Sequence, residues 1–319
     1  MSHELEFING EAAFAFAGSR ESIWHSLGTQ VSPDLTPQEI MKAAKLDWDV
    51  VKVPLTGMYD DEEVSTGSSA LLRTSDHSVL DVVPNSWNPV QNSEAFAFFD
   101  EFIDAGSMKM DTAGSIRNGR KVWALAKLND GFELFGGDKI EGYLLFSNPH
   151  YFGRCVDIKF TTVRTVCNNT LSLALKEDTD NWVRHSHRTE FDVDRVKALL
   201  GIVSTTMDAF KQQAEVLGSK VYSNDNAIEY FQKIFPVLTT KRSSRKELST
   251  QAARALEIVE TQPGAGFRPG SYWNLLQAVT YITSNEYGRN DETRLDSLWY
   301  GANEQRNRRA LKVAVQMAA

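Results

Sequence analysis

Extended apolar runs separated by polar turns are densest between residues 108 and 175, where they predict an antiparallel sheet. Asn118-Gly119 stands between two of these runs, and both residues accept the positive φ of a type I′ hairpin turn. The strands expected in this stretch are 110–117, 120–127, 141–146 and 155–163. The other predicted helices and strands lie before and after this sheet in the sequence.

Helix start signals lie on both sides of the predicted sheet. Thr36-Pro-Gln-Glu39 has the pattern of a capping box with proline at the first helical position. Asn92 caps an amphipathic helix over 94–105, and Asn168 or Asn169 caps a helix directly after the sheet. The helices expected towards the C-terminus are 193–217, 226–235, 244–260, 271–286 and 303–317.

The remaining segments complete an α+β fold class, an antiparallel sheet with β-hairpins and packed helices, followed by a helical C-terminal region. Residues 58–68 read as an exposed acidic loop, and short strands are expected at 70–74, 78–83 and 182–187. The predicted organisation is an irregular N-terminal arm over 1–35, an α+β sheet domain over 36–190 and a helical region over 191–319 that packs on it.

Composition narrows the class of protein. With 319 residues, of which 42% are hydrophobic, the chain can bury a core, and no apolar run approaches the length of about 18 residues that a membrane span needs. The N-terminal residues lack the basic start and apolar block of a signal peptide. Two cysteines are too few for a disulfide framework. These features predict a protein of a reducing cytosol that does not contact a membrane.

Charge and motifs exclude several enzyme classes. The net charge of −8 argues against a globally basic nucleic-acid-binding domain, although it does not exclude a local basic surface. The chain has no phosphate-binding P-loop, no dinucleotide fingerprint, no nucleophile elbow and no His-Glu-x-x-His motif. Cys167 is either a nucleophile activated by His150 or His185, or a small apolar core residue. No cofactor is expected from these motifs.

The predicted hairpin around Asn118-Gly119 is rich in cations. Cations beside an aromatic ring that can stack on a base are what a single-stranded nucleic-acid groove requires. The alternative is an ordinary solvated hairpin whose Trp123 packs into the core. The residues expected to bind nucleic acid are Arg117, Arg120, Lys121, Trp123, Lys159 and Arg164.

Histidines offer a second candidate chemistry. His185 and His187 alternate along a predicted strand, so their imidazoles share one face, as the ligands of a divalent metal ion can. His150 would join them only if the fold brought it close. The alternative is the polar face of an edge strand.

The last predicted helix, 303–317, has an apolar stripe of small residues opposite basic ones. It either packs on the helix at 272–282 of the same chain or turns its basic side to a partner. Both interpretations stay open from the sequence.

Several sequence blocks stand out in order along nearly the whole chain. They are Trp24-His-Ser-Leu-Gly28, Asn88-Pro-Val-Gln-Asn92, Thr112-Ala-Gly-Ser115, Gly119-Arg120, Val163-Arg-Thr-Val-Cys-Asn-Asn-Thr-Leu171, Arg184-His185, Tyr272-Trp-Asn-Leu-Leu-Gln-Ala-Val279 and Gly301-Ala-Asn303. Together these blocks resemble the phage/plasmid-like proteins of unassigned function. The resemblance implies a gene of a phage, a plasmid or an integrated element in a bacterial host, and it implies no reaction. In the order of its elements the chain is also similar to single-strand annealing proteins of the RecT and Erf kind, an analogy of outline only.

Three hypotheses about function follow. The first is a non-enzymatic protein of mobile-element DNA metabolism that binds and anneals single-stranded DNA as a homo-oligomer, without nucleotide hydrolysis. The second is a metal-assisted enzyme acting on nucleic acid or nucleotides through His150, His185 and His187. The third is an interaction protein that binds a host factor, for which the acidic stretch Asp60-Asp-Glu-Glu63 is the main feature.

Overall fold

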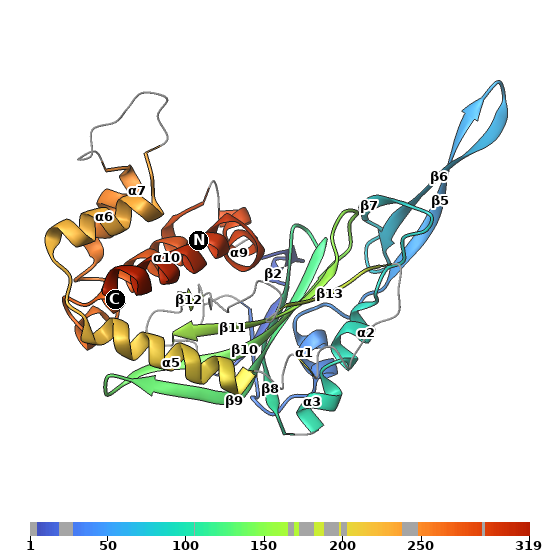
Figure 1. The fold of residues 1–319 in the computed structure, drawn as a ribbon. Helices are drawn as coiled ribbons and strands as arrows, with labels where there is room; N and C mark the ends of the chain where they lie inside the picture. The colour runs from blue at the N-terminus through green and yellow to red at the C-terminus, as the bar shows by residue number, and fades with distance from the viewer. Residues whose placement is uncertain are drawn as a thin grey trace. The chain divides into compact units, whose positions relative to one another are not determined.

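The computed structural model describes most of the chain, and Figure 1 shows its fold. The chain forms two compact units. Unit 1 comprises residues 1–129, 143–160 and 181–201, and unit 2 comprises residues 130–142, 161–180 and 202–319. The described residues are 5–18, 28–104, 106–164, 169–171, 182–187, 198, 203–237, 248–288 and 291–319.

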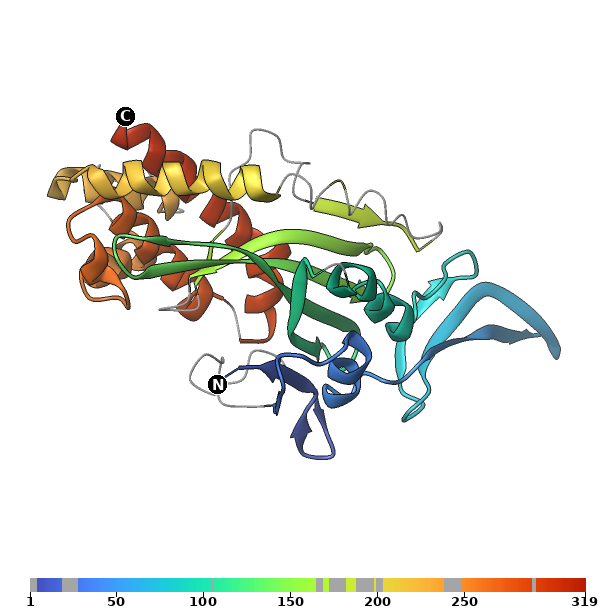
Figure 2. The same ribbon diagram turned by 90° about the horizontal axis from the view of Figure 1, so that it is seen from below.

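The predicted antiparallel sheet is confirmed, and it is larger than expected. Its strand order is β12-β11-β10-β9-β8-β3-β4, and β13 also pairs with β11. The meander of green strands in Figures 1 and 2 contains the four predicted strands, each extended at one or both ends. The bounds are β3 Phe14–Ala17, β4 Thr29–Val31, β8 Met108–Ile116, β9 Lys121–Leu134, β10 Asp138–Pro149, β11 Val156–Arg164, β12 Asn169–Leu171 and β13 Trp182–His185.

The hairpin at the centre of the prediction forms, but its connection is longer than two residues. Ile116 pairs with Lys121, so four residues make the turn. Asn118 and Gly119 have φ of 54° and 79°, as a type I′ turn requires, and Arg117 is also left-handed at 58°. The additional positive φ lengthens the connection beyond the tight turn that the Asn-Gly signal indicates.

The prediction of an irregular N-terminal arm needs correction. Strand β3 lies inside the large sheet, paired antiparallel with β8 and parallel with β4. Its residues Phe14, Ala15 and Phe16 are buried. A small two-stranded sheet precedes it, formed by β1 Phe7–Ile8 and β2 Glu11–Ala12.

A separate three-stranded antiparallel sheet in unit 1 has the order β5-β6-β7. Its strands are β5 Val50–Tyr59, β6 Glu62–Arg73 and β7 Val79–Pro84. The stretch 58–68, expected to be a loop, instead forms the end of a long hairpin that turns at Asp60 and Asp61, both with positive φ. Because β7 pairs only with residues 68–72 of β6, the rest of the hairpin extends as an arm (Figure 1).

The helices of unit 1 are short. Thr36 forms the predicted capping box with Glu39 at the start of α1 Pro37–Ala43. The single helix expected over 94–105 is two helices, α2 Asn92–Ala97 and α3 Asp100–Asp104. Gln91, rather than Asn92, is the residue before the first turn, since Asn92 is buried and its amide binds backbone oxygens elsewhere in unit 1.

Unit 2 contains most of the helices, and the predicted helical C-terminal region is confirmed. The prediction of a helix directly after the large sheet is wrong at the start of that helix, because residues 169–171 form strand β12. The first part of the predicted helix 193–217 lies largely outside the described residues. The helices are α5 Val203–Ser219, α6 Asn224–Ile234, α7 Thr250–Ile258, η3 Ala265–Phe267, α8 Tyr272–Tyr281, the π-helix η4 Ile282–Glu286, α9 Asp291–Tyr300 and α10 Ala302–Ala318.

The core of unit 2 surrounds α8, whose Trp273 is fully buried and donates from Nε1 to Asp138 Oδ2 at 3.1 Å. Helix α10 packs against α8, α9 and α6. Ala310 and Ala314 of its stripe are buried, and the Tyr230 hydroxyl donates to the Ala310 carbonyl oxygen at 3.1 Å. The intramolecular packing predicted as one alternative for this helix is therefore observed. Among the described helices, none has the length and apolar character needed to cross a bilayer.

Candidate functional site

Two turns of unit 1 bring arginines together: 117–120, between β8 and β9, and 150–155, between β10 and β11. The guanidinium carbons of Arg117 and Arg120 lie 5.9 and 5.1 Å from the ring centroid of Tyr151. Arg117 Nη1 also lies 3.5 Å from the Tyr151 hydroxyl oxygen. One aromatic ring thus contacts two cations of the same turn.

A backbone hydrogen bond ties the two turns to each other, since the His150 N–H donates to the Arg120 carbonyl oxygen at 2.7 Å. The second turn adds an exposed aromatic ring, because the side chain of Phe152 is 51% exposed. It also adds the exposed Arg154. We call the outward side of the two turns the turn surface: Arg117, Arg120, Phe152 and Arg154.

Among the described residues, the carboxylate of Asp81 borders the turn surface. Asp81 of β7 forms an ion pair with Arg120 at 3.3 Å and accepts a hydrogen bond from the Phe152 N–H at 2.7 Å. The ion pair is partly exposed and therefore weak. Asp81 thus pairs with one of the three arginines of the turn surface, Arg120.

Other residues expected to bind nucleic acid are placed differently. Trp123 is 3% exposed and packs on Phe14, with ring centroids 5.7 Å apart. Lys121 and Lys159 are also buried. This is the core packing that was the alternative for Trp123, and it leaves no face of that ring for a base. Arg164 belongs to β11 within unit 2, and its side chain lies outside the described residues.

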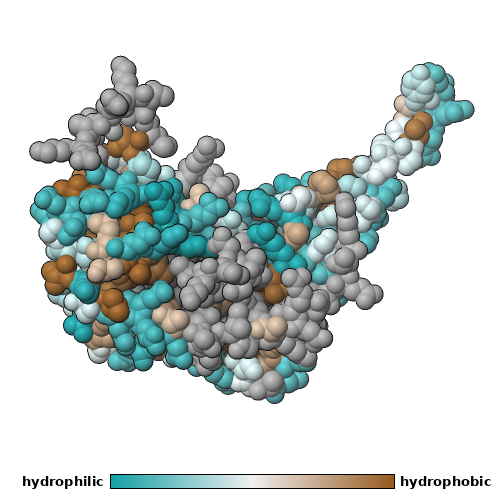
Figure 3. All heavy atoms as spheres, in the orientation of Figure 1, coloured by the Kyte–Doolittle hydropathy of each residue, from teal (hydrophilic) through white to brown (hydrophobic). Residues whose placement is uncertain are grey.

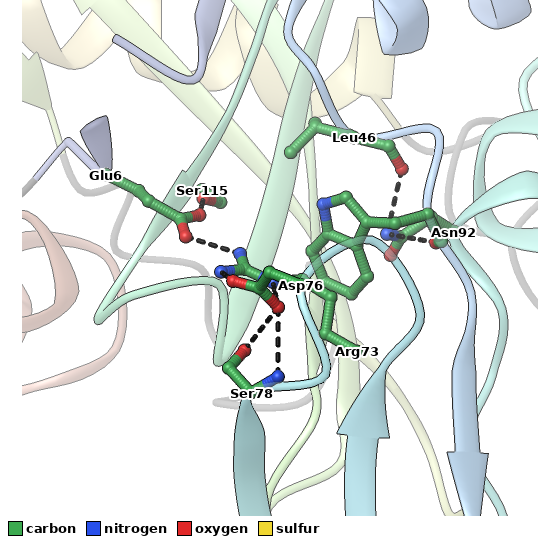
Figure 4. A network of polar contacts seen from close by, with 8 residues as sticks. Glu6, Leu46, Arg73, Asp76, Ser78, Asn92 and Ser115 are labelled. Atoms are coloured by element: carbon green, nitrogen blue, oxygen red, sulfur yellow. Dashed lines mark hydrogen bonds and ion pairs between the residues drawn. The ribbon is translucent and has the colours of Figure 1, made fainter. Parts of the chain in front are cut away.

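A buried ion pair lies directly beneath the first turn. Arg73 of β6 bonds both Glu6 and Asp76, and Ser115 donates to Glu6 (Figure 4). The side chains of Arg73 and Glu6 are 7% and 5% exposed. A Cβ atom on Gly119 would come within 2.5 Å of Arg73 Nη1, so glycine permits this close approach as well as the positive φ.

The buried polar network continues to His150. The Arg73 guanidinium lies 5.4 Å from the Trp48 ring, and Trp48 packs on His150 at 5.3 Å. Asn92 Nδ2 donates to the carbonyl oxygens of Leu46 and Trp48 (Figure 4), so Asn92 Oδ1 is the acceptor that faces His150 Nε2 at 3.0 Å. His150 therefore carries its proton on Nε2, and its Nδ1 has a buried lone pair without a hydrogen-bond partner among the described residues.

His187 has the same arrangement with the nitrogens exchanged. Its Nδ1 lies 3.1 Å from the Asn88 carbonyl oxygen and must donate there, which leaves the buried Nε2 without a described partner. The ring stacks on Trp87, with centroids 4.2 Å apart. Burial, and secondarily the nearby His187, lowers the pKa of His150 to about 3, and burial lowers the pKa of His187 to about 4. Both histidines are neutral at pH 7.

The predicted metal ligands His150, His185 and His187 are all buried in unit 1. Within the described part of the chain, no three His, Cys, Asp or Glu side chains are grouped closely enough to hold an ion. The metal-assisted alternative therefore has no ligand set among these residues. Cys167, the candidate nucleophile, lies outside the described residues.

Comparison with known proteins identifies the family. The model of a domain of unknown function, DUF932, matches residues 79–299. The chain belongs to the DUF932 family. Neither a curated protein nor a solved structure matches the DUF932 chain. The expectation of a family without an assigned function is thus confirmed, and the matched region contains the turn surface and the buried His150, His185 and His187.

Sequence reasoning missed two parts of this site in the DUF932 chain. Phe152 and Arg154 belong to Tyr151-Phe-Gly-Arg154, a break between two predicted strands that contains a glycine with φ of 83°. An exposed aromatic residue and a cation in a short turn were a usable signal. The Arg73–Glu6 pair joins residues 67 positions apart, and no local pattern indicates it.

Proposed function

We propose that this DUF932 chain binds single-stranded DNA through the turn surface, as a non-enzymatic protein of phage or plasmid DNA metabolism. The observation that carries the proposal is the meeting of two turns of unit 1, of which the first carries Arg117 and Arg120 and the second carries the exposed Phe152 and Arg154. Phosphates can pair with guanidinium groups, and a base can stack on the ring without sequence preference.

The proposal assigns Phe152 the stacking role first given to Trp123. Tyr151 and the buried network hold the arginines in place, because Arg117 and Arg120 both contact the Tyr151 ring. Arg154 lies on the exposed side of the second turn. A phosphate would compete with Asp81 for Arg120. Phosphate contacts release counterions from the DNA, so binding should weaken as salt rises.

Fluorescence anisotropy with a labelled oligothymidylate of roughly 20 nucleotides tests the proposal between 50 and 200 mM salt. Three phosphate contacts predict a slope of about −2 in log affinity against log salt, at about −0.7 per contact. Phe152→Ala should weaken binding by roughly 5- to 100-fold, the effect of one lost stacked base. Phe7→Ala is the matched control, because Phe7 is also 51% exposed and lies on β1.

Three results would contradict the proposal. They are no binding at low salt, binding that does not respond to salt, and equal affinity losses in the Phe152→Ala and Phe7→Ala variants. Arg154→Ala provides an independent check, because it should reduce the salt slope by about 0.7 and leave the circular dichroism spectrum unchanged.

A further inference from the structure

The three-stranded sheet β5-β6-β7 has one apolar face with exposed valines on its two outer strands, while Ala70 on the central strand is buried. By strand alternation and register, Val51, Leu72 and Val79 form one row across the sheet, and Val53, Ala70 and Val82 form the next. A third row continues towards the arm. We call these nine residues the valine face: Val51, Val53, Leu55, Ser68, Ala70, Leu72, Val79, Val82 and Pro84.

Exposure sets the valine face apart from the other side of the same sheet. Its four valines are 43%, 41%, 60% and 50% exposed, in the order 51, 53, 79 and 82. On the opposite side Val50, Leu71 and Val83 are buried. An antiparallel sheet with one buried face normally has polar residues on the other. In Figure 3 the arm is mostly pale to hydrophilic in colour, with separate hydrophobic groups at its base and near its tip.

Both edges of this sheet have features that hinder the addition of another strand. Pro54 lies within β5 and has no N–H to donate to a new strand. On the other edge, β7 has a bulge near Leu80 and ends at Pro84. Both devices are known to protect sheet edges. An association of this sheet therefore uses the valine face.

We infer that the valine face is the contact between two copies of this chain. It contains no charged residue of either sign, so two copies can meet without repulsion between like charges. Its exposed apolar surface, together with Val64 of the arm, is on the order of several hundred Å², a substantial part of the roughly 800 Å² that each partner of a stable dimer buries. Two such faces pack as the halves of a β-sandwich.

Charge at the arm tip sets the orientation of the two copies. Asp60, Asp61, Glu62 and Glu63 are all exposed. The repulsion between two such tips favours a two-fold arrangement with the arms antiparallel, so that the tips point apart. The turn surface stays accessible in this dimer, because Asp81 pairs with Leu71 and so lies on the face opposite the valine face.

Sedimentation equilibrium of the full chain from about 1 to 100 μM tests the inference. We expect twice the chain mass of 35.8 kDa at the upper end. Val53→Lys and Val82→Lys should each raise the dissociation constant at least about 100-fold, because each buries an unpaired charge in the contact. The matched control is Thr56→Lys, an exposed position on the opposite face of β5, which should leave the constant unchanged.

A wild-type chain that stays monomeric over the whole range overturns the inference, as does a dimer that both lysine variants leave intact. If Val53→Lys does not fold by circular dichroism, Val79→Lys replaces it at the most exposed of the four valines. The Phe152→Ala variant should keep the wild-type mass. The two experiments are therefore independent. The dimer inference can be refuted while DNA binding is observed, and the DNA-binding proposal can be refuted while the dimer is observed.

Discussion

Lowering the pH from 7 to 5 should destabilise unit 1, because two of its histidines are held neutral. The pKa of His150 is lowered to about 3 and that of His187 to about 4, mainly by burial. In the unfolded chain a histidine has a pKa of about 6.5. The unfolded state therefore binds more protons below pH 6.5. The stability present above that pH is lost as the pH falls towards 4.

The loss of unfolding free energy follows from the pKa shifts of His150 and His187. Each pH unit below 6.5 costs about 1.4 kcal/mol per histidine, so at pH 5 each contributes a loss of about 2 kcal/mol. Both together remove about 4 kcal/mol, a large part of the roughly 5–15 kcal/mol that stabilises a typical domain. Asp76 affects stability only at lower pH. The hydrogen bond from Arg73 lowers its pKa below the unfolded value of about 3.9, so its contribution to stability is lost only as the pH falls below that value.

Urea unfolding at pH 7, 6 and 5, read by pulse proteolysis and mass spectrometry of peptides from 143–152, measures unit 1 alone. His150→Asn should reduce the loss between pH 7 and 5 by about 2 kcal/mol. His77→Asn is the control, because His77 is exposed on the turn between β6 and β7 and asparagine accepts its positive φ. Equal losses in the wild type and both variants would refute the reasoning.

Three further predictions concern stability and are measured by urea unfolding. Gly119→Ala should cost about 2–4 kcal/mol, since it combines strain at positive φ with displacement of Arg73, whereas Gly57→Ala, with open space around it, should cost under about 1 kcal/mol. Arg73→Met should cost about 3–5 kcal/mol by leaving the Glu6 carboxylate buried, and a cost no smaller in the Glu6→Gln/Arg73→Met double variant would contradict that cause. Gly218→Ala should destabilise unit 2 by about 1–3 kcal/mol, because its Cβ would collide with the Phe135 ring, and an unchanged midpoint would contradict the close packing.

Local sequence signals gave the parts of the fold that depend on neighbours in the chain. Apolar and polar residues alternate along the strands of the large sheet, or two strands pair through a recognisable turn. The capping box at Thr36 likewise marks the start of α1 in the local sequence. Strand β3 was missed because Phe14-Ala-Phe-Ala17 is a short apolar run, ambiguous until its partner β8 is known. The arm was read as a loop because Ser, Thr, Gly and Asp dominate it, although backbone pairing makes it a hairpin.

The candidate site was predicted less well because its geometry depends on distant residues. The position of Arg117 and Arg120 on a turn followed from Asn118-Gly119. The burial of Trp123 did not, because it depends on Phe14 from β3 and on Gly114, which pairs with Trp123 across the hairpin. Nothing in local spacing places Tyr151 beneath two arginines, since that contact requires the turns of two different hairpins to meet.

The arm also separates opposite charges within unit 1. At about 3.3 Å per residue, its acidic tip lies on the order of 25 Å along β5 from Lys52, whose row includes Asp81 at the edge of the turn surface. The Debye length at physiological salt is about 8 Å, so the tip carboxylates neither cancel nor strengthen the field of the arginines. At physiological salt the acidic tip and the turn surface therefore act as two independent charged regions of unit 1. An approaching polyanion would be turned away from the arm and steered towards the arginine end, even though the chain as a whole is acidic.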